Sequence, residues 1–486
     1  MMRKQIFILL GSLLLSATAS TKNLTQQSVD KAREVIDNVI EAYGGNEKLT
    51  KLNSVIIKFN SRNLAVNQSR KPGPPWDENQ LDGTSMIDFK NQQFVTNIKS
   101  KTSSQEFHNG TIINADKSYQ VDYRASTASQ IAEPNFINST GPFIRVTPAL
   151  LVKQLMQRRH TVHYLGQDDV DGKPHDVLSL VMEVGPAISL YFDQENHILN
   201  KSERVVGTFG MIGYRFGDYK NIEGIPFNHS FKLYINDQNN INRKITGIKL
   251  NNSVTEFTKL KSNIAKVSPI QPDPLSRQKV SDGVYLIGGN GTYAMFVEME
   301  DYVVAVGGTA GIPERISLLK EVVSNKPIKF GVMTHHHNDH VLGGQAYADE
   351  GSIVIASRAH EKVIRDSTEN KKLKIETVNT KRIFKSGDRE LHVIDIGPTE
   401  HAEHLLIAYL PKEGIIFEAD HFGLRSAGNI PPAGPSTRSF AKSLQRNNVK
   451  VKSIVSAHSP IVASNTDLQS ALDKAKKLSV ASDVTH

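Results

Sequence analysis

Four histidines and one aspartate, all side chains that can bind a metal ion, lie side by side in the second half of this chain. They occur in the run His335-His336-His337-Asn338-Asp339-His340. Successive side chains of an extended segment alternate between two sides, so His335 and His337 point the same way and can reach one divalent ion at about 2.0–2.1 Å. Asp339 and His340, at the turn that follows, can face a second ion beside the first. The spacing therefore predicts a centre for two metal ions.

The other two members of the run, His336 and Asn338, point away from that side. We interpret them as groups that pack or that support the ligands. A solvated histidine cluster without a function is the alternative explanation of the run. The metal centre is favoured, because a chance tract has no reason to place an aspartate immediately before its last histidine.

The residues on either side of the run indicate how it is held. Residues 327–334, Pro-Ile-Lys-Phe-Gly-Val-Met-Thr, have the apolar pattern of a buried strand, and residues 341–347, Val-Leu-Gly-Gly-Gln-Ala-Tyr, predict a tight turn that opens a helix. The run then lies on a strand-to-helix loop. In layered α/β proteins, ligands bind at such loops at the carboxyl ends of strands.

The pattern His335-x-His337-x-Asp339-His340 resembles the signature of the metallo-β-lactamase fold superfamily, whose members are mostly dinuclear-zinc hydrolases. The resemblance implies that residues 281–486 form an α/β domain, the four-layer αββα sandwich of that family. Residues 282–289 and 294–298 resemble its opening hairpin. In many relatives an aspartate ends the third strand, whereas this chain has Gly307-Gly308, a departure that concerns local loop support more than metal binding.

The family also carries a later histidine, a bridging aspartate and a last histidine. His401 follows Gly397-Pro398, Asp420 ends the apolar stretch 414–420, and His458 ends the buried strand expected at 451–458. His404 is the alternative to His401. The resemblance thus implies one site of His335, His337 and His401, a second site of Asp339, His340 and His458, and Asp420 as the bridge between them.

The donor set bears on the metal and on the reaction. Nitrogen and oxygen ligands without thiolate suit zinc, although manganese or iron could occupy the same donors. The chain has no cysteine, which excludes thiolate catalysis and the branch of the family with a cysteine on the second zinc. The resemblance implies two Zn²⁺ per chain that share a hydroxide, formed near neutral pH, as the nucleophile. Asp339 is the expected catalytic residue, because it lies beside that nucleophile and orients it.

The amino terminus has the pattern of a secretory signal peptide. Arg3 and Lys4 precede an apolar run over residues 6–15, and Ala17-Thr18-Ala19 supplies a small-residue cleavage site. A membrane anchor needs roughly 20 apolar residues, so we expect no stable membrane span and an exported protein, periplasmic or secreted. The net charge is +8, but the basic residues are scattered and no basic tract is interleaved with aromatic residues. We expect a small-molecule substrate and no nucleic acid.

The 486 residues are enough for two domains with separate cores. Residues 28–43 have an amphipathic helical stripe that ends at Gly44-Gly45. From Ser54 onward alternating strands predominate, interrupted by a helix near residues 147–159. This order resembles the half-barrel of periplasmic lipoprotein-carrier proteins. We predict a signal peptide at 1–19, a mainly antiparallel α+β accessory domain at 20–262, a proline-rich linker at 263–280 and the catalytic domain at 281–486.

Together these features predict an exported metal-dependent hydrolase that cleaves an ester, lactone or amide bond, the last as in a β-lactam. Two alternatives stay open. One is a periplasmic lipid- or precursor-binding protein in which the metal domain is mainly a scaffold. The other is a phosphodiesterase or nuclease of the same superfamily. The sequence does not indicate the natural substrate or the oligomeric state.

Overall fold

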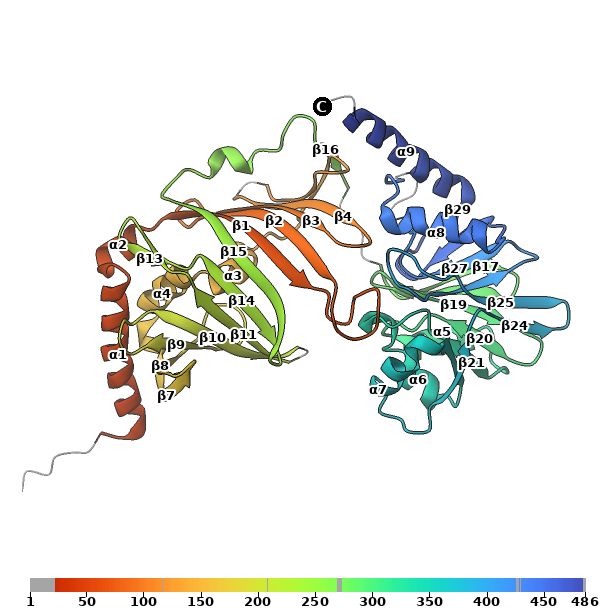
Figure 1. Ribbon diagram of the computed structural model, residues 1–486, viewed down its shortest axis with the longest axis horizontal. Helices are drawn as coiled ribbons and strands as arrows, with labels where there is room; N and C mark the ends of the chain where they lie inside the picture. Colours follow the sequence, from red (N-terminus) through yellow and green to blue (C-terminus); the bar gives the residue numbers. More distant parts are fainter. Residues whose placement is uncertain are drawn as a thin grey trace, which may run out of the picture.

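The computed structural model describes residues 22–115, 117–207, 209–268, 273–424, 428 and 430–483. The chain is mixed α/β and rich in strands. One large sheet is built by the N-terminal half and two smaller sheets by the C-terminal half, and the two halves lie side by side in Figure 1. The predicted signal peptide, residues 1–19, lies outside the described residues. Within the part of the chain that is described, no helix is long and apolar enough to cross a membrane.

The N-terminal sheet has fourteen strands in the order β16-β6-β5-β4-β3-β2-β1-β15-β14-β11-β10-β9-β8-β7. Neighbouring strands are antiparallel except for β16, which pairs with β6 in parallel. The bounds are β1 Ser54–Leu64, β2 Glu78–Asp88, β3 Gln93–Lys101, β4 Glu106–Ile113, β5 Tyr119–Asp122, β6 Thr127–Gln130, β7 His163–Val170, β8 Lys173–Leu180, β9 Ile188–Asp193, β10 Leu199–Val206, β11 Gly210–Gly217, β14 Ser230–Ile235, β15 Gln238–Leu250 and β16 Ala265–Val267. A separate hairpin joins β12 Lys220–Ile222 and β13 Ile225–Phe227.

Helices cover one face of this sheet and share its largest apolar core. Their bounds are α1 Leu24–Ala42, α2 Gly45–Lys51, α3 Phe136–Arg145 and α4 Pro148–Gln157, with 3₁₀ turns at Arg159–Thr161 and Thr255–Thr258. Asn23 caps α1, because its side chain accepts a bond from the Gln26 amide at 2.9 Å. The apolar stripe predicted at 28–43 is buried in α1, as at Ile36 and Val39. The sequence analysis does not predict α3, which contains Pro142, a residue that normally disfavours a helix interior.

The C-terminal half contains a seven-stranded and a six-stranded sheet. The first has the strands β17 Ser276–Ser281, β18 Val284–Gly289, β19 Thr292–Glu298, β20 Val303–Val306, β21 Ile328–Val332, β22 Ile353–Ser357 and β23 Lys374–Val378. The second has β24 Lys381–Ser386, β25 Arg389–Asp395, β26 Leu406–Leu410, β27 Ile415–Glu418, β28 Ser453–Ser456 and β29 Ala463–Ser464. β20 to β23 pair in parallel, as do β27 and β28.

The central strands of both sheets, such as β20, β26 and β27, are buried on both faces. In β26, Leu406 and Ala408 join a core formed by residues of both sheets, whereas Ile407 and Tyr409 join a core with helices α8 and α9. Alternate residues of the first sheet likewise pack against α5 and α6. Strands buried on both faces read as nearly continuous apolar runs. The helices are α5 Ile312–Lys320, α6 Gly344–Asp349, α7 Glu361–Asp366, α8 Pro435–Arg446 and α9 Asn465–Asp483, with 3₁₀ turns at Asn338–His340 and Arg358–His360.

The segment predicted as a linker, 263–280, contains two short strands. β16 adds to the edge of the N-terminal sheet, and β17 is the first strand of the seven-stranded sheet. Each end of the segment is therefore tied by backbone hydrogen bonds to the sheet beside it. Residues 269–272, between the two strands, lie outside the described residues.

Candidate metal centre

The histidine run follows β21 directly, as its pattern predicts. β21 ends at Val332, and the chain stays extended at His337 before Asn338–His340 makes a 3₁₀ turn. This turn ends the alternation of the extended segment. The side chains of Asp339 and His340 therefore lie on the same side of the loop as those of His335 and His337. Burial is complete for His335 and His340, at 0% exposure. Rings taken out of water in this way are costly unless they find partners.

A first group, called here the first triad, joins His335, His337 and His401. One ligand atom from each lies within 4.8 Å of the other two. His335 and His401 approach most closely, with their Nε2 atoms 3.1 Å apart. The His337 ring centroid lies 4.4 Å from that of His335 and 4.5 Å from that of His401. Residues from the loop after β21 and the loop after β25 thus meet at one point.

A second group, the second triad, joins Asp339, His340 and His458, which also offer ligand atoms within 4.8 Å of one another. The His340 and His458 Nε2 atoms are 3.0 Å apart. Asp339 Oδ2 is 3.4 Å from His340 Nε2 and 3.8 Å from His458 Nε2. This triad is more open than the first, because the Asp339 side chain is 47% exposed and that of His458 is 34% exposed.

Asp420 lies between the two triads, in the loop after β27. Its Oδ2 atom is 3.5 Å from His335 Nε2 and 3.4 Å from His401 Nε2, both in the first triad. The same atom is 3.1 Å from His340 Nε2, and Oδ1 is 3.1 Å from His458 Nε2, both in the second triad. One carboxylate therefore contacts rings of both groups.

These separations fit donors that share metal ions. Two donors that each lie 2.0–2.1 Å from a zinc ion at a tetrahedral angle are about 3.3 Å apart, and the nitrogen and oxygen distances above run from 3.0 to 3.8 Å. Asp420 Oδ2 and His340 Nδ1 are buried without a hydrogen-bond partner among the described residues. A divalent cation placed among these atoms would satisfy the buried carboxylate oxygen and the surrounding ring nitrogens together. The residues present fit a divalent metal.

The electrostatics favour free lone pairs on the first triad. Burial, and then the nearby rings of His401 and His336, lower the pKa of His337 to about 2. Burial and neighbouring histidines also hold the pKa of His335 well below its usual value. Burial raises the pKa of Asp420, but His340 and His401 outweigh this effect and hold it well below the ordinary range. Neutral rings at His335 and His337 and an ionised Asp420 are the protonation states that metal ligands require. In contrast, burial opposes the charged form of His458, but Asp420 outweighs this effect and raises the pKa of His458 to about 9, so a metal ion would have to displace a proton there.

His401, rather than His404, joins the cluster. His404 Nδ1 is instead 2.8 Å from Asp395 Oδ2. The His401 amide donates to Thr399 Oγ1 at 3.2 Å, which helps to fix the loop that carries it. The two residues outside the predicted ligand set belong to neither triad: the His336 ring packs 4.8 Å from that of His360 and 4.9 Å from that of His337, and the Asn338 side chain accepts a bond from Gln68.

Gly308, the second residue of the Gly307-Gly308 pair, has no room for a side chain. A Cβ at Gly308 would collide with the carbonyl oxygen of His340 and with the sulfur of Met333. The Gly308 carbonyl in turn accepts a bond from the Gly343 amide at 2.7 Å. The histidine loop thus lies directly on the backbone at this position, and no larger residue fits there without moving it.

The structure adds a group that the sequence analysis missed, in the loop between β1 and β2. Ser69 and Gln68 of this loop hydrogen-bond to His337 and Asp339. One signal was available: the connection from Ala65 to Asp77 is far longer than the roughly two to five residues usual in hairpins. Long loops of this kind are often functional.

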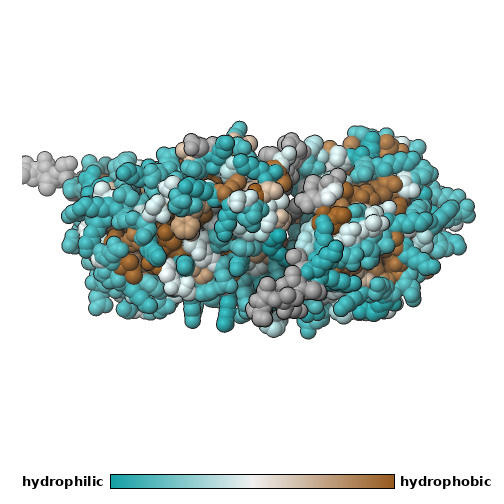
Figure 2. All heavy atoms as spheres, turned by 90° about the horizontal axis from the view of Figure 1, so that it is seen from above, coloured by the Kyte–Doolittle hydropathy of each residue, from teal (hydrophilic) through white to brown (hydrophobic). Residues whose placement is uncertain are grey.

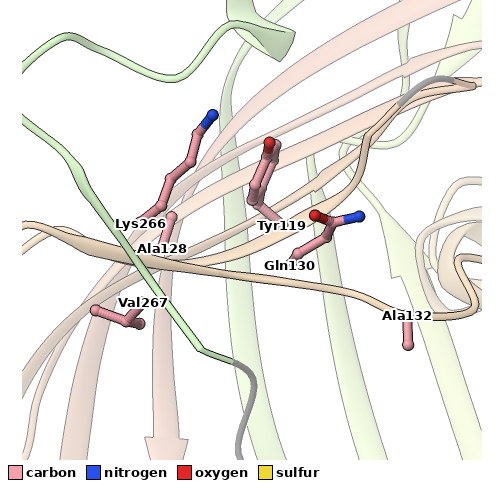
Figure 3. A pocket seen from close by; sticks show the side chains of 6 residues that line it. All are labelled: Tyr119, Ala128, Gln130, Ala132, Lys266 and Val267. Atoms are coloured by element: carbon pink, nitrogen blue, oxygen red, sulfur yellow. The ribbon is translucent and has the colours of Figure 1, made fainter.

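A cavity elsewhere in the molecule does not overlap this centre. It has a volume of about 270 Å³ and lies where β16 pairs with β6, lined by Tyr119, Ala128, Gln130, Ala132, Lys266 and Val267 (Figure 3). Lys266 and Gln130 are its polar groups, and Tyr119 supplies an aromatic wall. None of the residues of the two triads lines it.

Among the solved structures similar to this chain are proteins named metallo-β-lactamase and a flavodiiron protein. One from Pontibacter korlensis is 22% identical, and the match covers 42% of this chain and 99% of that chain with a TM-score of 0.34. A metallo-β-lactamase from Pseudomonas aeruginosa, solved in its mono-zinc form, is 20% identical over 44% of this chain and 100% of its own, with a TM-score of 0.33. A flavodiiron protein from Giardia intestinalis is 18% identical over 43% of this chain and 60% of that one, with a TM-score of 0.33. No family model matches the chain. A search of curated proteins also found no match.

Proposed function

We propose that this protein is a metal-dependent hydrolase whose centre holds two divalent ions, zinc by preference. The observation that supports it most is the position of Asp420, whose two carboxylate oxygens lie 3.1 to 3.5 Å from rings of both triads. A carboxylate in this position would be able to hold one ion at each triad. A purely structural site needs neither a second group of ligands nor an open side.

The chain's own residues divide the work. His335, His337 and His401 would hold one ion in the buried part of the centre, and Asp339, His340 and His458 the other at its open side. When bound, such a metal pair would lower the pKa of a bound water toward neutral and would also polarise the oxygen of the scissile bond. The Asp339 carboxylate, 47% exposed at the open side of the centre, would be placed to orient such a water and to accept its proton. Buried walls around the first triad exclude bulk water and strengthen these electrostatic effects.

The finer features of the proposal follow from the sequence. We propose the four-layer αββα arrangement for residues 281–486, export to the periplasm or the outside, and a small-molecule substrate with an ester, lactone or amide bond. Because no cysteine is present, no thiolate competes as nucleophile or ligand. Phosphodiester cleavage by the same ligand set is the alternative reaction within this class.

The test is metal analysis of the purified full-length protein together with a substrate panel. We expect two zinc equivalents per chain and turnover of an ester, lactone or β-lactam that stops with a chelator and returns with Zn²⁺. Turnover of phosphodiesters alone would select the nuclease-like alternative. A protein without bound metal, or turnover that a chelator leaves unchanged, would contradict the proposal.

A second candidate function is suggested by the N-terminal half, which we propose as a binding site for an anionic amphiphile. Arg145 of α3, Arg204 of β10 and Arg243 of β15 each have a buried Nε atom without a hydrogen-bond partner among the described residues. The Arg243 guanidinium lies 3.9 Å from the Phe59 ring, and burial lowers its pKa to about 10. Buried cations without a nearby carboxylate are costly. An acidic head group would offset that cost while its apolar tail contacts the aromatic residues.

This second candidate is tested with oleate as the probe. The affinity of the full-length protein for oleate is measured by the displacement of a fluorescent fatty acid. This affinity should fall at least tenfold in Arg243→Met, whereas Arg62→Met, a change at an exposed arginine, should leave the affinity unchanged. Equal binding by both variants, or none by the unaltered protein, would contradict a lipid-binding role.

A further inference from the structure

The loop between β1 and β2, from Ala65 to Asp77, belongs to the N-terminal half but lies against the histidine loop of the C-terminal half. The two strands and their connection extend from the N-terminal sheet toward the other half in Figure 1. We infer that this loop is part of the metal centre, and that Ser69 and Gln68 are positioning residues that orient one ligand in each triad. The inference rests on the proposed metal binding and extends it across the two halves of the chain.

Ser69 acts on the first triad through its backbone. Its carbonyl oxygen is 3.0 Å from His337 Nε2 and 2.9 Å from His336 Nε2. A carbonyl can only accept, so both Nε2 atoms carry the hydrogen. In the neutral His337 ring the lone pair is then on Nδ1. The bond thus selects the tautomer in which Nδ1 is the metal donor, the task that outer hydrogen bonds perform for ligating histidines in general.

Gln68 acts on the second triad through its side chain. Its Nε2 atom donates to Asp339 Oδ1 at 2.9 Å and also to Asn338 Oδ1. The other oxygen, Asp339 Oδ2, faces His340 and His458. The two oxygens of the carboxylate thus have different partners: Oδ1 is held by the loop, and Oδ2 points at the other two members of the second triad. The backbone adds a bond from the Asn338 amide to the Asn67 carbonyl at 3.2 Å.

The loop is fixed well enough to position these groups. Ser69 is 1% exposed, and its hydroxyl donates to the Ala65 carbonyl at 2.9 Å and accepts from the Asp77 amide at 2.8 Å. The Asp77 carboxylate in turn accepts from the Arg70 amide at 2.7 Å. These bonds join the beginning of the loop to its end. They therefore fix the direction in which the Ser69 carbonyl group points.

The same loop also contacts the segment that carries His401. Arg70 Nε donates to the Thr399 carbonyl at 3.1 Å, and the Arg70 carbonyl accepts from the Glu403 amide at 3.0 Å. Two segments that supply ligands, one after β21 and one after β25, are thus joined through residues of the N-terminal half. The loop covers the buried first triad, which leaves the exposed side of Asp339 and His458 as the approach for a substrate.

The test uses Zn²⁺ as the probe in competition with a chromophoric chelator, on the full-length protein. Gln68→Leu keeps the size of an exposed side chain and removes its hydrogen-bond donors. We expect the zinc affinity of the second triad to fall about tenfold to a hundredfold. Ser69→Ala removes the hydroxyl that fixes the loop and should weaken the first site. Lys259→Met, which removes only a surface ion pair with Glu256 at 2.7 Å in the N-terminal half, is the matched control and should bind zinc as the unaltered protein does.

Nitrogen NMR of the histidine rings gives a second readout that does not depend on turnover. In the unaltered protein His337 should carry its hydrogen on Nε2, and in Ser69→Ala the two tautomers should mix. Unchanged zinc affinity in both Gln68→Leu and Ser69→Ala would overturn the inference. If the unaltered protein binds two zinc ions but hydrolyses no substrate, the proposed function fails, and the effects of the loop variants on zinc affinity still decide this inference.

Discussion

Replacing Asp420 by asparagine removes one negative charge at the point where the two triads meet and preserves the size of the side chain. Asp420 Oδ2 lies 3.1 Å from His340 Nε2 and 3.5 Å from His335 Nε2. At an effective dielectric constant of about 20, a unit charge and a divalent ion roughly 3.5 Å apart attract each other by about 9 kcal/mol. The amide oxygen and local relaxation recover part of this energy. We expect a loss of at least about 3 kcal/mol, which is roughly a hundredfold in zinc affinity.

The assay is a zinc titration against a competing chelator, combined with metal counting after dialysis. Asp420→Asn should retain at most one zinc per chain where the unaltered protein retains two. Asp88→Asn is the matched control, since Asp88 is also a buried carboxylate but bonds only to Asn91 in the N-terminal half. If Asp420→Asn kept two zinc ions with unchanged affinity, Asp420 could not lie between the ions.

Three further predictions concern the neighbourhood of the centre. His401→Ala should abolish zinc binding at the first triad and keep at most one zinc per chain by elemental analysis, whereas His404→Ala, which loses its partner Asp395, should keep both; equal losses would contradict the choice of His401. Gly308→Ala should destabilise the protein by about 1–3 kcal/mol in urea unfolding, because the added methyl collides with the His340 carbonyl, and an unchanged midpoint would refute that contact. Burial, and then His336 and His404, lower the pKa of His360 to about 3, so below pH 6.5 the unfolded chain gains a proton that the native protein does not. The stability associated with His360 is present above that pH and falls with acid, by about 2 kcal/mol at pH 5. Between pH 7.5 and pH 5, the free energy of unfolding of the metal-free protein should therefore fall by about 2 kcal/mol less in His360→Leu than in the unaltered protein. An identical fall in both proteins would count against the lowered pKa of His360.

Most of the candidate ligands can be predicted from the sequence because they follow a strand. Apolar runs buried on both faces are legible as strands, and the polar residue that follows such a run lies at the sheet edge, as His335, Asp420 and His458 do. Local pattern could not decide between His401 and His404, because both lie in one irregular loop; the bond from His404 to Asp395 separates them.

The elements that the sequence did not indicate depend on contacts between distant residues. Ser69 and Gln68 meet His337 and Asp339 across some 270 positions, at a separation of 268 for the first pair and 271 for the second. No periodicity reports such a contact, and only the length of the loop drew attention to it. α3 was missed for a local reason, since Pro142 disfavours a helix that tertiary packing of Phe143 and Ile144 nevertheless stabilises. The strands β16 and β17 are three and six residues long and are defined by their pairing partners rather than by their own composition.

The presence of two ions at this centre is tested most directly by anomalous diffraction at the zinc edge from crystals of the zinc-loaded protein. We expect two peaks about 3.5–4 Å apart, one contacted by His335, His337 and His401, the other by Asp339, His340 and His458, with the Asp420 carboxylate touching both. A single peak, or two peaks of which Asp420 contacts neither, would contradict a dinuclear hydrolytic centre.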